Sequence, residues 1–311
     1  MTAETAIRPR LTLRRNTAPD RATRPGAAWV VPAIVFFAIF ALLPMVGVVY
    51  LSFTSWSGLG SPALTGAANW KQLVHDPQFW QSLRLSAIFI VSSWLIQTVI
   101  SLLIGVWAAG KQRGRAVMSA IFFLPLVMSS TAIAITWQVL LDPNFGLAGW
   151  LGPKVGFPSG NIIGSPDGAL LMVIFVGAWQ FIPFHTLLYQ GAARQIPRVL
   201  YDAAITDGAG RYQQFWHVTL PLVRNTVITS SLIILVGALT SFETVLILTQ
   251  GGPGTATRIL PYEMYSEGFN SYQYGYGSAI AVVLVVVATI LSVLMTRLTG
   301  FSRMRSTLEG L

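Results

Sequence analysis

Two polar side chains lie inside long apolar runs, at positions where they could contact a substrate. Glu243 lies in ALTSFETVLILTQ, and Gln180 follows Trp179 in GAWQFIPFH. An ionisable group within a spanning run is costly unless it faces a cavity or a partner. Aromatic rings beside amides or carboxylates suit sugars, because the rings pack on C–H faces while hydroxyls take hydrogen bonds. The alternatives are structural: the ring packs within the bundle, and Thr240, Ser241 or a neighbouring helix satisfies the carboxylate.

Constellations for catalysis are absent from the sequence. There is no G-x-x-x-x-G-K-[ST] phosphate loop, no G-x-S-x-G elbow and no H-E-x-x-H motif. The three histidines lie on different segments without metal-ligand spacing, and the absence of cysteine excludes thiolate metal sites and disulfides. We therefore expect a chain that is not an enzyme and holds no cofactor of its own.

The elements that must position these residues are membrane-spanning helices. The chain is 53% hydrophobic and only 10% charged, whereas soluble domains carry about 25% charged residues. A spanning helix needs about 20 mostly apolar residues. Six runs meet this length, at residues 28–51, 85–109, 117–140, 169–189, 222–248 and 277–298. The sequence predicts an all-α integral membrane protein with six transmembrane helices, in which interior prolines are tolerated.

The distribution of basic residues predicts the orientation. With the N-terminus in the cytoplasm, the inner segments hold 16 of the 20 lysines and arginines, and the outer segments hold only Lys71, Arg84, Lys154 and Arg258. Cytoplasmic loops carry such an excess. The expected topology is N-in/C-in, and the net charge of +9 indicates orientation and contact with membrane lipid, with no nucleic-acid partner.

The remaining segments divide the chain into a spanning domain and two tails. Residues 1–27 hold six arginines and few long apolar side chains, which predicts a disordered basic cytoplasmic tail. We expect a six-helix transmembrane domain at 28–299 and a cytoplasmic tail at 300–311. The aromatic residues of the outer loops are interpreted mainly as interfacial anchors, with contact to a sugar or an outside partner as the alternative for some.

The longest polar stretch of the second half lies between the fourth and fifth runs, within residues 198–221. It contains LYDAAITDGAGRYQQFWHVTLP. The pattern predicts a short amphipathic helix, a break at Gly208 where a Cβ would be awkward, and a second short helix stopped by Pro221. An ordinary connector on the membrane surface is the alternative.

This stretch resembles the coupling loop of the inner-membrane subunits of bacterial ABC importers. Their pattern is E-A-A, three residues, G, nine residues, I-x-L-P. It is matched by Asp202-Ala203-Ala204, Gly208 and Val218-Thr219-Leu220-Pro221, with Asp for Glu and Val for Ile. The resemblance implies a cytoplasmic coupling helix between spans 4 and 5 that docks on an ATP-binding subunit. The residues it assigns to coupling are Tyr201, Asp202, Ala203, Ala204, Asp207, Gly208 and Ala209.

A second stretch resembles the carbohydrate type, namely the permeases similar to the maltose-transporter F-subunit but without its large periplasmic insertion. Phe242-Glu243, LTQGGP at 248–253 and YGYGSA at 274–279 match the F-D, L-T-x-G-G-P and G-Y-x-S-A elements, with Glu for the usual Asp. Trp179 with Pro183-Phe184 matches a fourth-span element. The substrate-lining positions implied by this resemblance are Gly177, Gln180, Phe181, Phe184, Ala238, Ser241 and Glu243.

The resemblance implies a multi-pass permease subunit of the bacterial cytoplasmic membrane that imports a sugar or oligosaccharide by alternating access. Its implied partners are a second permease in a heterodimer, two ATP-binding subunits that hold ATP and Mg, and an extracytoplasmic sugar-binding protein. Two alternatives stay open. One is a glycerol-phosphate-type ABC permease, which Glu243 and the lack of a basic cluster at depth disfavour. The other is an ion-coupled secondary transporter with Glu243 as its ion site.

Overall fold

The computed structural model describes residues 27–110 and 115–298, and it divides into two compact units, residues 1–46 and 47–311. The expected tails at 1–27 and 300–311 lie almost entirely outside the described residues. In the first unit, a 3-10 turn (Ala27–Val30) leads into α1 (Val31–Phe37) and a π-helical turn (Ala38–Leu42). With α2 (Leu43–Leu51), these form one continuous helix that is long and apolar enough to span a membrane.

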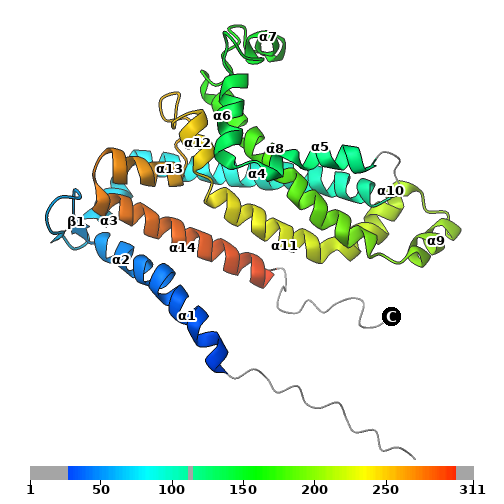
Figure 1. Ribbon diagram of the computed structural model, residues 1–311, viewed down its shortest axis with the longest axis horizontal. Helices are drawn as coiled ribbons and strands as arrows, with labels where there is room; N and C mark the ends of the chain where they lie inside the picture. Colours follow the sequence, from blue (N-terminus) through cyan, green and yellow to red (C-terminus); the bar gives the residue numbers. More distant parts are fainter. Residues whose placement is uncertain (1–26, 111–114, 299–311) are drawn as a thin grey trace, which may run out of the picture. The chain divides into compact units, whose positions relative to one another are not determined.

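Four long helices form the second unit: α4 (Pro77–Ala109), α8 (Pro166–Arg194), α11 (Leu220–Leu239) and α14 (Tyr274–Leu298). The packing of α4 on α8 is the most extensive in the chain, and α11 lies against both helices (Figure 1). Gly105 permits the close approach of α4 to α8, because a Cβ there would lie 2.8 Å from the Cβ of Tyr189. These contacts make α4, α8 and α11 the frame around which the shorter helices are arranged.

Helix α4 begins eight residues before the apolar run that predicts it. Asp76 caps its N-terminus by accepting a hydrogen bond of 2.9 Å from the backbone nitrogen of Gln78, and Pro77 occupies the first turn. The hydroxyl of Tyr276 at the start of α14 donates to the other oxygen of Asp76. The first turns of α4 are therefore held by a cap, by a neighbouring helix and by the burial of Phe79 in an apolar cluster that also includes residues of α14.

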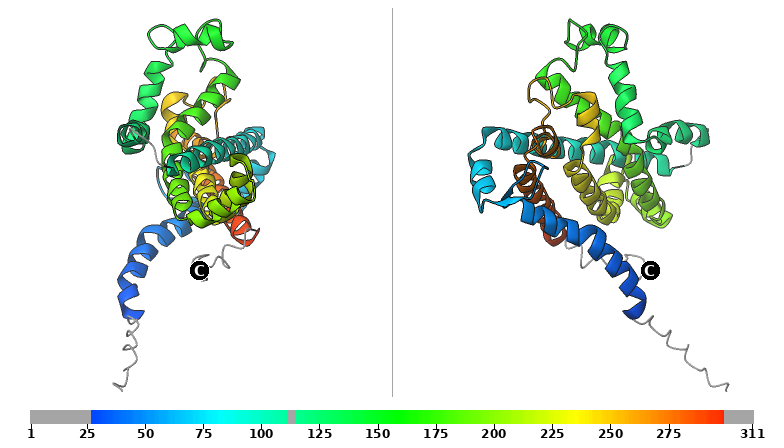
Figure 2. Two further views of the ribbon diagram at one scale, coloured as in Figure 1. Left: turned by 90° about the vertical axis from the view of Figure 1, so that its right-hand side faces the viewer. Right: turned by 60° about the vertical axis from the view of Figure 1, so that its left-hand side comes forward.

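The third predicted span is two helices rather than one. The chain forms α5 (Arg115–Val127) and α6 (Ser130–Leu140), whose axes differ by 115°. The oxygen of Ser129 accepts a hydrogen bond of 3.2 Å from the backbone nitrogen of Ala132 and so begins a new helix. In both views of Figure 2, α6 runs in a different direction from α5. A continuous helix over 117–140 was therefore the wrong expectation.

The fifth predicted span also ends earlier than expected. Helix α11 ends at Leu239, and a separate helix, α12 (Glu243–Leu248), follows after three residues. The hydroxyl of Thr240 donates to the carbonyls of Val236 and Gly237, both at 3.2 Å. A threonine that bonds these last carbonyls favours a helix end, and hydropathy alone does not register it.

Pro221 does not stop the second helix of the polar loop. Helix α9 (Arg198–Thr206) and α10 (Arg211–Gln214) are separated as expected, but α10 continues through the π-helical turn η4 (Phe215–Thr219) into α11. The backbone nitrogen of Leu220 bonds the carbonyl of Phe215, five residues back. Pro221 directly follows this wider turn, at a point where the regular pattern of i to i−4 hydrogen bonds is already interrupted, so the continuous helix tolerates its missing N–H group.

The segments between the long helices carry short elements. A two-residue pairing joins β1 (Thr54–Ser55) to β2 (Ala63–Leu64), with Thr54 opposite Leu64. The other elements are α3 (Ala68–His75), α7 (Ala148–Leu151), a 3-10 turn (Gly152–Val155), α13 (Leu260–Tyr265) and a π-helical turn (Ser266–Asn270).

Two buried apolar clusters hold the second unit together. The larger joins α4, α6, α8, α11 and α12, and the smaller joins α3, α4, α13 and the start of α14. Within the described ranges, five helices are long and apolar enough to cross a membrane, or six if the bent pair α5 and α6 counts as one span. The mostly helical class with several spans is thereby confirmed.

Candidate functional site

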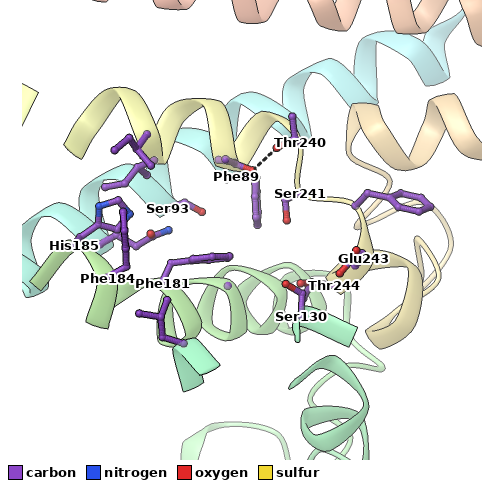
Figure 3. Close-up of a pocket in the computed structure, with 18 residues that line it drawn as sticks. Phe89, Ser93, Ser130, Phe181, Phe184, His185, Thr240, Ser241, Glu243 and Thr244 are labelled. Atoms are coloured by element: carbon purple, nitrogen blue, oxygen red, sulfur yellow. Dashed lines mark hydrogen bonds between the residues drawn. The ribbon is translucent and has the colours of Figure 1, made fainter. Parts of the chain in front are cut away.

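A pocket of about 630 Å³ lies within the second unit, among α4, α8, α11, the end of α5, the start of α6 and the start of α12. Its volume is in the range of ligand sites. Figure 3 shows its lining: the rings of Phe89 and Phe181 lie in the middle, with polar side chains on either side. The three residues between α11 and α12 form part of one pocket wall: Thr240, Ser241 and Phe242.

The two ends of the pocket differ in their polar groups. At one end lie Glu243 and Thr244 of α12 together with Ser130 of α6 (Figure 3). At the other end lie Ser93 of α4 and His185 of α8. Each end can hydrogen-bond a polar ligand, and the rings between them offer apolar faces.

Six of the seven residues expected to line a substrate site lie on this pocket: Gly177, Phe181, Phe184, Ala238, Ser241 and Glu243. Gln180 does not. It is buried, and its amide donates a hydrogen bond of 3.1 Å to the hydroxyl of Ser130. Its neighbour Trp179 packs edge-on against Trp137 at 5.5 Å between ring centroids. The Gln180 amide thus orients the side chain of Ser130, a residue of α6 that lines the pocket.

Glu243 is the first residue of α12, and its side chain is exposed in this chain. Among the described residues, no hydrogen bond or ion pair of its carboxylate is found. The structural alternative, in which Thr240 or Ser241 hydrogen-bonds this carboxylate, is therefore not observed. The N-terminal position favours a negative charge, because the backbone N–H groups of a first turn point toward it. The carboxylate is therefore available to the pocket.

The contribution of α4 could not be found from the sequence motifs. Phe89, Ser93 and Gln97 follow one another at four-residue intervals, so they share one face of α4, and all three line the pocket. The signal that could have found them is a polar stripe on an apolar helix, since the buried positions of α4 include Ser82, Ser86, Ser93, Gln97 and Ser101.

His185 was also not singled out. It is buried, and its Nδ1 lies 2.8 Å from the hydroxyl of Ser230 on α11. The ring packs edge-on against that of Phe184. The contact joins α8 to α11 at the pocket wall, which His185 itself lines, and fixes the orientation of the imidazole. A hydroxyl partner across the helices could not be inferred from the spacing in the sequence.

The polar loop places its motif residues on the surface of one helix. Helix α9 ends in a paired hydrogen-bond motif, in which Gly208 bonds Ile205 at 2.9 Å and Ala209 bonds Ala204 at 2.8 Å through backbone groups. Gly208 has φ +79°, a conformation that favours glycine. An added Cβ would meet no atom within 4 Å, so the requirement for glycine here is the backbone conformation.

The seven residues assigned to the loop lie close together. Asp202, Ala203, Asp207 and Gly208 are exposed, while Tyr201, Ala204 and Ala209 are half-buried. The hydroxyl of Tyr201 lies 2.9 Å from that of Thr219 in η4. This contact ties α9 to the helix that continues into α11.

A buried carboxylate outside the pocket could not be identified from the sequence. Glu263 of α13 is 1% exposed, and one of its oxygens lies 3.4 Å from the guanidinium of Arg258. The other oxygen has no hydrogen-bond partner among the residues that the structure describes. Burial raises the pKa of Glu263, and the charge of Arg258 partly opposes this. No group of three or more His, Cys, Asp or Glu residues suited to a metal occurs in the part of the chain that the structure describes.

Comparisons with known proteins agree with this architecture. Residues 101–302 match the family described as the binding-protein-dependent transport system inner membrane component. A probable ABC transporter permease protein of Bacillus subtilis, YurN, is 34% identical over 86% of this chain and 94% of its own length. The trehalose/maltose transport system permease protein MalF of Thermococcus litoralis is 27% identical over 91% of this chain and 96% of its own length.

A solved structure has the same fold. A chain of a bacterial alginate ABC transporter, in complex with an alginate pentasaccharide-bound periplasmic protein, superposes with a TM-score of 0.76 at 22% identity. The match covers 88% of this chain and 92% of that one. The multi-span helical fold, the family match over most of the chain and the permease relatives lead to one conclusion. The chain belongs to the binding-protein-dependent transport system inner membrane component family.

Proposed function

We propose that this chain is a permease subunit that moves a sugar or oligosaccharide across the cytoplasmic membrane in an ATP-driven importer. The observation that carries the proposal is the lining of the pocket. Phenylalanine rings lie between two sets of hydroxyl, amide and carboxylate groups, and no lysine or arginine lines it among the described residues. Such a lining suits a neutral polyhydroxylated ligand. The relative named for trehalose and maltose transport supports the same class.

In this proposal the chain has six spans with both termini in the cytoplasm, and the bent pair α5 and α6 is the third. The excess of basic residues on one side of the expected spans supports this orientation. Helix α9, within the coupling loop 198–221, then lies on the cytoplasmic side. The spanning domain corresponds to residues 28–299, with cytoplasmic segments before and after it.

Helix α9 is proposed to receive the movement of an ATP-binding partner. Tyr201, Asp202, Ala203, Ala204, Asp207, Gly208 and Ala209 form the contact. The short side chains permit close approach, and the contact of Tyr201 with Thr219 passes the displacement toward α11. Each partner must bind the inward-open and outward-open states with different affinity, because only a differential affinity shifts their populations.

The importer would contain a second permease in a heterodimer, two ATP-binding subunits and an extracytoplasmic sugar-binding protein. ATP and Mg would be held by the ATP-binding subunits, since this sequence has no phosphate loop. The substrate would pass from the binding protein into the pocket, where Gly177, Phe181, Phe184, Ala238, Ser241 and Glu243 line its path, and Gln180 holds Ser130 in place.

The test is uptake by the complete importer in proteoliposomes. We expect ATP-dependent accumulation of at least one radiolabelled neutral sugar from a panel of glucose, maltose, maltotriose and cellobiose, and only a low level of glycerol 3-phosphate. Accumulation of glycerol 3-phosphate alone would establish the anionic substrate instead. Uptake by this chain reconstituted without ATP-binding subunits, driven by an ion gradient, would show that it is a secondary transporter.

A further inference from the structure

The polar stripe along α4 has two kinds of members. Two of its side chains are bonded to neighbouring elements. The hydroxyl of Ser86 accepts a hydrogen bond of 2.7 Å from the backbone nitrogen of Leu260 in α13. The hydroxyl of Ser101 donates one of 3.1 Å to the carbonyl of Ile182 in α8. These side chains join α4 to the helices around it.

Ser93 and Gln97 lie between these bonded positions on the same stripe and make no such contact. They are 2% and 6% exposed, and no hydrogen bond of either side chain is found among the described residues. Both line the pocket. Their polar atoms are not among the buried polar atoms that lack a partner in the described residues, so these atoms are accessible from the pocket. An amide and a hydroxyl on mostly buried side chains, with no protein partner and with access to a cavity, can complete their hydrogen bonds with a ligand.

The position of this pair in the pocket defines what the ligand must reach. Figure 3 shows Ser93 and His185 on one side of the rings of Phe89 and Phe181, and Ser130, Glu243 and Thr244 on the other. A ligand with one hydroxyl-bearing unit, bound at one end of the pocket, leaves the polar groups at the other end without a ligand partner. A ligand with two hydroxyl-bearing units, separated by a face that packs on the rings, satisfies both ends at once.

We infer that Ser93 and Gln97, with His185 beside them, form a second sugar subsite, and that the pocket takes a ligand of at least two linked sugar units rather than a monosaccharide. This inference rests on the proposed function. Gln97 offers both a donor and an acceptor, and Ser93 offers a hydroxyl, so together they match a sugar edge that has adjacent hydroxyls. The pocket volume of about 630 Å³ has room for such a ligand.

The absence of cysteine from this chain permits a direct test. Ser93→Cys and Ser130→Cys are made singly, and each assembled importer is treated with a small water-soluble methanethiosulfonate, with and without saturating glucose or the accepted disaccharide. We expect both cysteines to react, and the disaccharide to slow both reactions about tenfold. Glucose should protect at most one of them. The control is Ser101→Cys, which should not react because the position is fully buried and does not line the pocket.

Uptake gives a second readout that does not depend on cysteine. Gln97→Met removes the amide at nearly constant length, and we expect it to lower uptake of the disaccharide about tenfold, since one lost hydrogen bond of this kind changes an equilibrium by about that factor. The control is Gln138→Met, an exposed position on α6 that does not line the pocket. It should leave uptake unchanged.

The outcomes separate the inference from the proposed function. If the parent importer accumulates a disaccharide and Ser130→Cys is protected while Ser93→Cys is unreactive or unprotected, the second subsite does not exist. Unchanged disaccharide uptake by Gln97→Met would also contradict the second subsite. This test holds even if a cysteine variant fails to assemble. If the parent accumulates no neutral sugar, the proposed function itself fails, before either variant is considered.

Discussion

The polar loop and the pocket are polar regions of the second unit that are built in opposite ways. The loop draws its residues from one segment, where a single helix and a Gly208 turn determine its surface. The pocket draws its lining from α4, α5, α6, α8, α11 and α12. A site built from one segment acts through its own shape, whereas a site built from six helices depends on how those helices pack. Substitutions in the two regions should therefore fail in different ways.

The largest effect is expected in the loop. Gly208→Trp places a large side chain on the surface proposed to contact the ATP-binding partner, in a backbone conformation that L residues rarely adopt. Uptake of every accepted substrate should fall by about tenfold or more, because loss of one central interface contact has that effect. The measurement is uptake and stimulated ATPase activity in proteoliposomes.

The matched control is Gly66→Trp. Gly66 also has positive φ (+58°) and open space around its Cβ position, but it lies in the segment between β2 and α3. Its backbone strain is comparable, and it is outside the loop. Equal loss of uptake in both variants would mean that strain, rather than the docking surface, causes the defect.

The next effect concerns the frame of the pocket. In Gly105→Ala the new Cβ would lie 2.8 Å from the Cβ of Tyr189 and 2.9 Å from the carbonyl oxygen of Thr186. Helices α4 and α8 must separate, which should cost about 1–3 kcal/mol. Thermal unfolding in detergent should show a lower midpoint. The control is Gly191→Ala, on α8, where a new Cβ would have open space around it. This variant should keep the parental unfolding midpoint. A lower midpoint in both variants would show that close packing of α4 on α8 is not the cause.

A smaller effect is expected at the end of the pocket nearest α12. Glu243→Gln removes the only carboxylate that lines the pocket among the described residues. Repulsion of an anion by one solvated charge is worth about 1 kcal/mol, so uptake of glycerol 3-phosphate relative to sugar should rise about fivefold from its low level. Glu267→Gln, away from the pocket lining, should not change this ratio. A loss of all transport in Glu243→Gln alone would instead favour an ion-coupling site.

The smallest effect is a dependence of stability on pH that arises outside both regions. Burial raises the pKa of Glu263, so the folded protein holds this proton more tightly than the unfolded chain does. Stability is then greatest below the unfolded pKa and falls as the pH rises through the folded pKa. Glu263→Gln should raise the unfolding midpoint by a few degrees at neutral pH and lose this advantage at acidic pH. If the difference in unfolding midpoint between Glu263→Gln and the parent instead grew toward acidic pH, the pKa of Glu263 would be lowered rather than raised by folding.

The comparison also explains what could be predicted from the sequence. The α9 helix and its turn at Gly208 follow from local spacing and were predicted correctly, as was the general class of the fold. The breaks at Ser129 and Thr240 were missed, because a capping hydroxyl looks like any other in an apolar run. Ser93 and Gln97 could not be assigned, since their role depends on α8 and α11 packing beside α4. Gln180 shows the converse: its depth was inferred, but not that it faces Ser130 rather than the pocket.

The length of α4 has a consequence for the lipid around the protein. Its 33 residues extend about 50 Å, while the hydrocarbon layer of a bilayer is about 30 Å thick. The helix must tilt or project beyond this layer, and acyl-chain length then acts on its angle. Hydrogen bonds hold α4 to α13 and α8, and Trp94 bonds Ser231 of α11 at 2.9 Å. A change in bilayer thickness would thus be transmitted to the helix that carries Ser93 and Gln97, and the angle of this pocket wall would depend on the membrane around it.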